Sequence, residues 1–186
     1  MITADDCYRV LSIPFLDRKR CGRITASVLS AIHTGQLAAH ETTDHDHTWF
    51  HDPCLAAPEL TSFVAACSVP ARLGMQVIRP RHTMPVHRDD HYLSTRISSI
   101  VVALLPYDQI PSTHWYAAET DTEPAVTATW RKWEPKLLNI QQWHGGISVQ
   151  DRHRVTLQIS LAASFETVID FIRARRLFGD YACDLA

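Results

Sequence analysis

A single run of eight residues constrains the fold of this chain more than any other part of its sequence. Residues 154–161 read Arg-Val-Thr-Leu-Gln-Ile-Ser-Leu, so polar and apolar side chains alternate without a break. Successive side chains of an extended strand point to opposite faces, and the run therefore predicts a β-strand with one polar and one apolar face. A polar face this regular meets either solvent or the lining of a cavity.

The same β-rich texture extends back to Gly74. Short runs of β-forming residues, separated by prolines, predict further strands over residues 75–78, 97–105 and 137–140. Strands of this length and spacing are typical of an antiparallel β-fold.

Helices are expected on both sides of this β-rich part. Between Ile24 and Ile32 apolar residues recur at helical spacing, and Gly35 can end that helix. A second helix is expected around residues 60–67, and Ser164 can cap a third.

The chain has 186 residues, a length that suits one hydrophobic core. We therefore expect a single domain of mainly β structure with flanking helices. Its parts are a helical N-terminal part (about 1–73), a β core (about 74–162) and a C-terminal helix (about 164–178).

Charge and composition exclude several classes of function. The formal net charge is −2 and the charges are scattered, so no basic stripe for duplex nucleic acid is predicted. The N-terminus lacks the pattern of a secretory signal and no apolar run is long enough to span a membrane, so a cytoplasmic protein is expected. Five widely spaced cysteines without a CxxC pair predict neither a disulfide framework nor a thiolate zinc site.

Eleven histidines direct attention to metal binding, because neutral imidazole is the commonest metal ligand among side chains. His87 and Asp89 stand two residues apart, a spacing that sends both side chains to one face of a strand. His144 follows a second β-like run and stands ten residues before Arg154. Two histidines and one carboxylate form the facial triad that leaves three positions of Fe(II) open.

With these motifs in this order, the sequence resembles the Fe(II)/2-oxoglutarate-dependent oxygenases, whose pattern is HxD, a distal histidine and then an arginine. The resemblance covers residues 75–161, about half of the chain, and implies a double-stranded β-helix, or jelly roll. It implies His87, Asp89 and His144 as iron ligands and catalytic centre. It also implies that Arg154 and Thr156 bind the distal carboxylate of 2-oxoglutarate.

The resemblance further implies a dioxygenase that couples O2 and the decarboxylation of 2-oxoglutarate to succinate with oxidation of a C–H bond. The carboxylate ligand Asp89 indicates hydroxylation rather than halogenation. Substrates across the family include protein side chains, amino acids, nucleobases and other metabolites, and the sequence does not select among them.

Two other functions stay open. One is a cupin-type metal enzyme that does not use 2-oxoglutarate, although its usual HxH pair occurs here only as His45 and His47. The other is a jelly-roll module that only binds metal.

Several further residues are weaker candidates. Arg152 can replace Arg154 if the preceding loop is short, and Gln76 can contact the cosubstrate. Asp90 follows the HxD motif but would lose the same-face spacing with His87, and a pairing of Asp89 with His91 does not match the family pattern. His153 is expected to be exposed.

A second histidine cluster spans residues 44–52 and contains His45, His47 and His51. It has the ligand types of a metal site, but no periodicity, so a hydrated loop is the simpler interpretation and a lid over the site is the functional one. Trp115, Tyr116, Trp130 and Trp133 lie between the ligand motifs and receive no site role, because tryptophan more often packs in a core.

Overall fold

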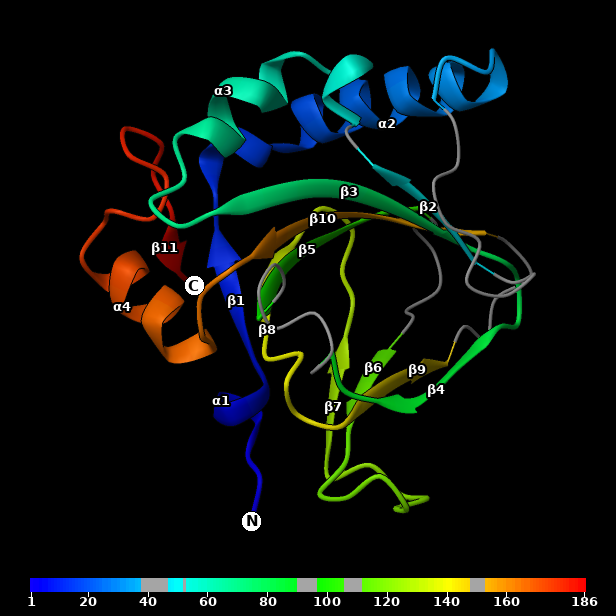
Figure 1. Ribbon diagram of the computed structural model, residues 1–186, viewed down its shortest axis with the longest axis vertical. Coiled ribbons are helices and arrows are strands. Elements are labelled where there is room, and N and C mark those ends of the chain that lie inside the picture. The colour runs from blue at the N-terminus through cyan, green and yellow to red at the C-terminus, as the bar shows by residue number, and fades with distance from the viewer. Residues whose placement is uncertain (38–46, 52, 90–96, 106–111, 148–152) are drawn as a thin grey trace.

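The computed structural model describes residues 1–37, 47–51, 53–89, 97–105, 112–147 and 153–186. In this part of the chain two antiparallel β-sheets face each other, and helices cover one of them (Figure 1). The helices are α1 (Ala4–Cys7), α2 (Arg18–His33), α3 (Glu59–Ala65) and α4 (Phe165–Arg173), with the 3-10 turns η1 (Pro14–Leu16) and η2 (Pro53–Leu55).

The major sheet has the strand order β11-β1-β8-β5-β10-β3-β2. Its members are β1 (Tyr8–Ser12), β2 (His47–His51), β3 (Ala71–Ile78), β5 (Ser98–Leu105), β8 (Pro135–Leu138), β10 (Arg154–Leu161) and β11 (Asp184–Leu185). The alternating run of the sequence is β10, which pairs with β5 on one side and with β3 on the other. Strand β10 is therefore an inner strand of the sheet, and its residues are buried along almost its whole length, which makes its polar face unusual.

The minor sheet has the order β4-β9-β6-β7 and lies across the major sheet (Figure 1). Its strands are β4 (Thr83–His87), β6 (Ser112–Trp115), β7 (Val126–Thr129) and β9 (His144–Ile147). The predicted jelly roll is confirmed.

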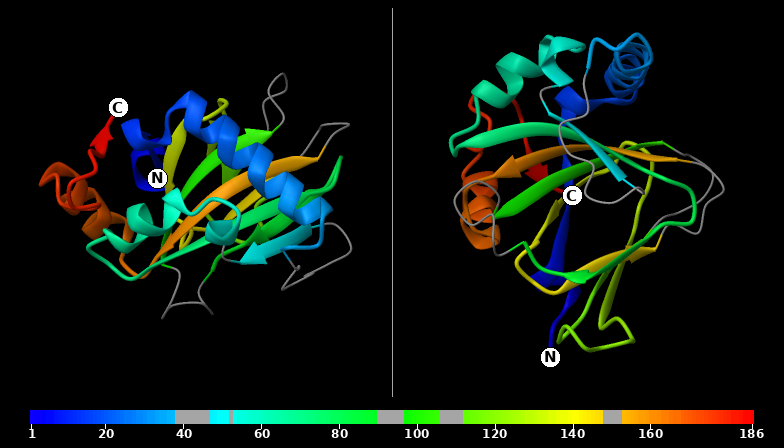
Figure 2. Two further views of the ribbon diagram at one scale, coloured as in Figure 1. Left: turned by 90° about the horizontal axis from the view of Figure 1, so that it is seen from above. Right: turned by 45° about the vertical axis from the view of Figure 1, so that its right-hand side comes forward.

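The outer face of the major sheet packs against α2 and α3, as the view from above makes clear (Figure 2). Leu157 and Ile159 of β10 are fully buried in one core with Ile24 and Val28 of α2 and with Phe63 of α3. The apolar face of β10 therefore packs against the helices. Its polar face must therefore look into the space between the two sheets.

Part of that inner space is filled by a second core around Trp115 and Trp130. Both indoles are buried and both are hydrogen-bonded: Trp115 Nε1 donates to Asn139 O at 3.1 Å and Trp130 Nε1 donates to Thr113 Oγ1 at 3.0 Å. These tryptophans are packing residues, as expected.

The expected helices over 24–32 and 60–67 are present as α2 and α3, and Gly35 has the positive φ of 72° that a residue after a helix often adopts. The C-terminal helix ends earlier than expected, at Arg173. Residues 1–73 contain two strands besides the helices, because β1 and β2 belong to the major sheet. Among the described residues no helix is long and apolar enough to cross a membrane.

Candidate metal centre

Two strands of the minor sheet bring the two predicted histidine ligands together. His87 is the last residue of β4 and His144 is the first of β9, and the two are direct neighbours across the antiparallel pair. Direct neighbours project from the same face of a sheet. Asp89 follows after Arg88, and its backbone N–H donates to the carbonyl of Ile140 at 3.0 Å, which fixes the chain just beyond β4.

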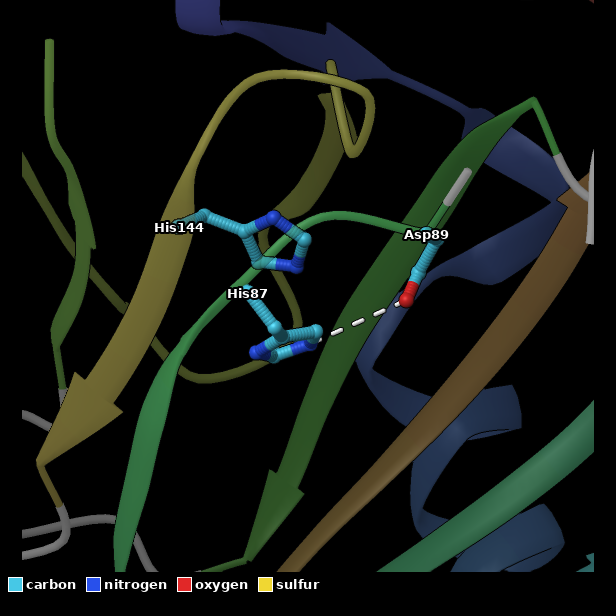
Figure 3. Close-up of side chains that lie close together, drawn as sticks. All are labelled: His87, Asp89 and His144. Atoms are coloured by element: carbon cyan, nitrogen blue, oxygen red, sulfur yellow. Dashed lines mark ion pairs between the residues drawn. The ribbon is translucent and has the colours of Figure 1, made fainter. Parts of the chain in front are cut away.

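The three side chains converge, as predicted from the spacing of the motifs (Figure 3). One ligand atom from each of His87, Asp89 and His144 lies within 4.8 Å of the other two. The distance from His87 Nε2 to Asp89 Oδ1 is 3.7 Å, and the two imidazole centroids are 4.4 Å apart with an interplanar angle of 48°. Asp89 and His144 are buried, whereas the His87 side chain is 32% exposed. The cluster is thus accessible from one side.

Backbone carbonyls orient both imidazoles. His87 Nδ1 lies 2.8 Å from Pro85 O, and His144 Nδ1 lies 2.9 Å from Gln142 O. A carbonyl can only accept, so each contact assigns the proton to Nδ1 and leaves Nε2 as the nitrogen able to ligate. This outer hydrogen bond is usual for metal-bound histidine.

Gly145 allows the two ligand-bearing strands to approach closely. A Cβ atom at this position would lie 3.0 Å from Met84 O and 3.2 Å from Pro85 O, both on β4. A side chain there would force β4 and β9 apart and separate the histidines. Next to the histidine pair, the Arg88 guanidinium lies over the Trp143 ring, with 4.8 Å between Arg88 Cζ and the ring centroid. This cation–π contact is a second link between the chain after β4 and the chain before β9.

Arg154 lies on the inner face of β10 and is buried, with 7% of its surface exposed. Burial lowers the pKa of its guanidinium to about 10, so the group is still charged at neutral pH. Within the described residues, Arg154 Nε and the buried hydroxyl of Thr156 have no hydrogen-bond acceptor or donor. A buried cation in this condition needs an anion, which a ligand carboxylate can supply.

The weaker site candidates from the sequence are placed differently from one another. Gln76 is buried on β3, directly beside Thr156, and accepts a long hydrogen bond of 3.5 Å from Gln158 Nε2. His153 is exposed, as expected. Arg152, Asp90 and His91 lie outside the described residues.

The second histidine cluster is only partly described. Residues 44–46 and 52 lie outside the described part of the chain, but 47–51 form β2, the edge strand of the major sheet. The expectation of a loop is therefore wrong for this segment, because its backbone pairs with β3 from His47↔Ile78 to His51↔Gly74.

Comparisons with known proteins add the fold family. The SnoK structure, a non-heme alpha ketoglutarate dependent carbocyclase from nogalamycin biosynthesis, is similar with a TM-score of 0.59 and 14% identity, over 82% of this chain and 78% of that chain. A Pseudomonas putida prolyl-4-hydroxylase is similar with a TM-score of 0.54 and 12% identity, over 83% of this chain and 91% of that chain. The chain has the fold of the non-heme 2-oxoglutarate-dependent oxygenases.

A third similar structure holds the epimerase SnoN in complex with Fe3+, alpha ketoglutarate and nogalamycin RO, with a TM-score of 0.58, 14% identity and coverage of 82% and 77% of the two chains. No protein-family model matches the sequence, and no curated protein matches it.

Sequence reasoning gave no role to Gln158, although the same alternation that indicated Arg154 puts it on the inner face. The missing information was the register of β10 against β3, which sets Thr156 opposite Gln76 and Gln158 opposite Gly74. No local pattern in the sequence encodes that register.

Proposed function

We propose that this protein is an Fe(II)- and 2-oxoglutarate-dependent oxygenase, and specifically a hydroxylase. The observation that carries the proposal is the convergence of His87, Asp89 and His144 to within 4.8 Å at the end of two paired strands. The shared fold with solved oxygenases supports the same assignment.

The donor set fits the metal. Two imidazole nitrogens and one carboxylate are the protein ligands of non-heme Fe(II) oxygenases, in which the other positions stay open. His87 and His144 would bind through Nε2, since the Nδ1 atoms face carbonyls. A carboxylate from Asp89 would fill the position that must be vacant for halide, which favours hydroxylation.

Bound iron with 2-oxoglutarate supplies oxidative decarboxylation to succinate coupled to oxidation of a C–H bond. The chain's own residues bind and orient the cosubstrate. Arg154 would pair through its planar fork with the distal carboxylate, and the hydroxyl of Thr156 would donate to the same group. Arg154 is buried, and the low dielectric of a buried site strengthens this charge-assisted contact.

The substrate does not follow from the fold. The similar structures carry the names epimerase, carbocyclase and prolyl-4-hydroxylase, so one architecture serves different reactions.

The test has two stages, both with purified protein. Anaerobic isothermal titration with Mn(II) in place of Fe(II) should show metal binding and then metal-dependent binding of 2-oxoglutarate. Aerobic incubation with Fe(II) should then release succinate, and the His144→Ala variant should release none above background. Metal binding without any 2-oxoglutarate binding would overturn the proposal and leave a metal-binding jelly roll.

A further inference from the structure

The first half of α2 carries a group of exposed cations. Arg18, Lys19 and Arg23 are exposed, and none of them forms an ion pair with a carboxylate among the described residues. The first turn of this helix contains no acidic residue. Cations are unfavourable in the first turn of a helix, because the helix dipole is positive there. These side chains therefore do not stabilise the helix that carries them.

A second segment of the chain adds positive charge beside α2. Arg131 and Lys132 lie in the connection from β7 to β8, next to Trp133. The Trp133 ring centroid lies 5.2 Å from Arg18 Cζ and 3.6 Å from Lys132 Nζ. Trp133 has a φ of 59°, which bulky residues rarely adopt, and its backbone N–H donates to Ala103 O at 3.0 Å. We refer to the cations of the two segments as the basic patch: Arg18, Lys19, Arg23, Arg131 and Lys132.

Like charges lie close enough in the basic patch to disfavour one another. Burial and the charge of Arg18 lower the pKa of the Lys132 ammonium. Arg131 lowers the pKa of Lys136, in addition to the larger effect of burial. An anionic partner would relieve this repulsion, because a nearby negative charge favours the charged form of each cation.

The carboxylates near the basic patch have structural partners of their own. Asp17 caps α2 by accepting a hydrogen bond from Arg20 N at 2.7 Å, and Glu134 forms an ion pair with the buried Lys136. The Arg20 guanidinium donates to Phe15 O at 2.7 Å and lies 4.0 Å from the Phe15 ring centroid. Arg20 is therefore a structural cation, and neither carboxylate pairs with the exposed arginines of the basic patch.

The helix surface between these cations carries only small residues. Helical geometry puts Gly22 about 40° and Ala26 about 80° around the axis from Arg18. Arg23 lies farther around the same face, at about 140°. A Cβ atom at Gly22 would have no other atom within 4 Å, so packing gives no reason for a glycine that weakens the helix relative to alanine. The result is a bare strip with cations on both edges.

The chemistry of the basic patch favours carboxylates over other anions. Arginine presents a planar fork that binds a carboxylate through two hydrogen bonds. The Trp133 ring already carries two cations, so it offers no open platform on which a nucleobase could stack. Among the described residues, Met1 alone is an exposed large apolar side chain, whereas a helix that binds a membrane surface needs an apolar face.

We propose that the basic patch is a docking surface for an acidic segment of a partner protein, rich in Asp and Glu. The segment lies along the bare strip over Gly22 and Ala26, and its carboxylates pair with the arginines at the two edges. This surface is separate from the candidate metal centre, because α2 covers the outer face of the major sheet and the ligand histidines belong to the minor sheet (Figure 2). The inference therefore holds or fails independently of the proposed function.

The test uses a fluorescein-labelled oligoglutamate peptide, titrated with the full chain at low ionic strength and followed by fluorescence anisotropy. The double variant Lys19→Glu, Arg23→Glu changes α2, and Arg131→Glu changes the second segment; neither variant alters a side chain at Trp133. The matched control is Arg72→Glu, Arg79→Glu, which reverses two exposed arginines outside the patch and changes the net charge as much as the first variant does. Thermal melting of each variant is compared with that of wild type.

Wild type should bind the peptide and release it as added salt screens the charges. The double variant should weaken binding by about tenfold and the control by less than about twofold, since exposed ion pairs are individually weak and only those in contact count. Arg131→Glu should also weaken binding, and it carries the test alone if the double variant does not fold. An equal loss in the control would show that net charge alone is responsible and would overturn the inference, as would failure of wild type to bind.

Two further probes are titrated in parallel: an oligothymidylate of the same charge, and vesicles of phosphatidylserine and phosphatidylcholine. The proposal expects the oligoglutamate peptide to bind more tightly than either. Tighter binding of the oligothymidylate or the vesicles through the same residues would overturn the assignment to an acidic protein, and would favour a nucleic acid or a membrane instead.

Discussion

The space between the two sheets has an apolar part and a polar part, which differ in whether their buried polar atoms are hydrogen-bonded. In the apolar part, Trp115 and Trp130 pack against small and branched side chains, and both indole nitrogens are hydrogen-bonded. In the polar part, on the inner face of β10, Arg154 Nε and the side-chain oxygens of Thr156 and Gln158 have no such contact among the described residues. Among the described residues, the buried Ser99 Oγ on β5 is a further atom of this kind.

The difference distinguishes buried polar atoms that stabilise the fold from buried polar atoms that are available to a ligand. A buried polar atom without a hydrogen bond reduces stability. Such atoms are therefore expected where a ligand can supply the missing hydrogen bonds. The apolar part holds the sheets together. The polar part contains the buried cation Arg154, and its unpaired guanidinium N–H and the Thr156 hydroxyl can both donate to an anionic ligand.

Removal of a ligand side chain should have the largest effect. We expect His144→Ala to lose Fe(II) binding and turnover, because only Asp89 and the partly exposed His87 would remain. His45→Ala and His47→Ala should keep the metal. Anaerobic Mn(II) titration measures all three variants, and loss of metal in either control with retention in His144→Ala would mean that His144 is not a metal ligand and that the other histidine cluster binds the ion.

Trp115→Ala tests the structural role of the apolar part. Trp115 is fully buried, and removal of a large aromatic side chain from a core costs about 3–5 kcal/mol. Chemical denaturation of the metal-free protein should show this loss of unfolding free energy.

The matched change in the polar part is Thr156→Val, which keeps the shape and removes a hydroxyl that has no hydrogen bond among the described residues. We expect the metal-free protein to keep its stability or to gain up to about 1 kcal/mol, since an unsatisfied group is replaced by an apolar one. A loss comparable to that of Trp115→Ala would show that the two parts do not differ in the way described.

Arg154→Ala should act on the cosubstrate and not on the metal. A charge-assisted contact to a carboxylate contributes on the order of 1.5–3 kcal/mol, so 2-oxoglutarate affinity should fall roughly ten- to hundredfold. Arg154→Lys should fall in between, because it keeps the charge and loses the fork. Titrations of Mn(II) and of 2-oxoglutarate separate the two affinities. Equal 2-oxoglutarate binding by wild type and Arg154→Ala would direct attention to Arg152.

The sequence predicts features that depend on neighbouring residues better than features that depend on pairing between distant segments. The alternation in residues 154–161 is local, and it correctly indicated an inner polar face with Arg154 and Thr156 on it. The HxD spacing is also local, and the two residues do converge with His144.

Pairing between distant strands carries no comparable signal. Strands β6, β7 and β9 have four residues each, too few for a periodic pattern. The N-terminal strand β1 joins the major sheet through β8, more than a hundred residues later, and this was not predicted. The contact between Gln76 and Gln158 depends on the same kind of long-range register.

A further expected effect depends on pH and concerns a charge in the apolar part. Lys136 is buried there, paired with Glu134 and close to Trp130. Burial, together with the positive charge of Arg131, lowers the pKa of Lys136 to about 8 from an ordinary value of 10.5. Between these two pH values the unfolded chain binds more protons at this site than the folded chain, so this group makes stability rise with pH.

Below pH 8 the cost of burying the charge is present in full, and above pH 10.5 it is gone. The double variant Glu134→Gln, Lys136→Met removes the charge without leaving Glu134 unpaired. It should be more stable than wild type at pH 7, by about 1–2 kcal/mol after allowance for the lost ion pair. This advantage should shrink steadily in denaturation curves recorded from pH 8 to pH 10. An advantage that does not change over this range would mean that Lys136 titrates normally, and that the apolar part accommodates its one buried ammonium at no cost.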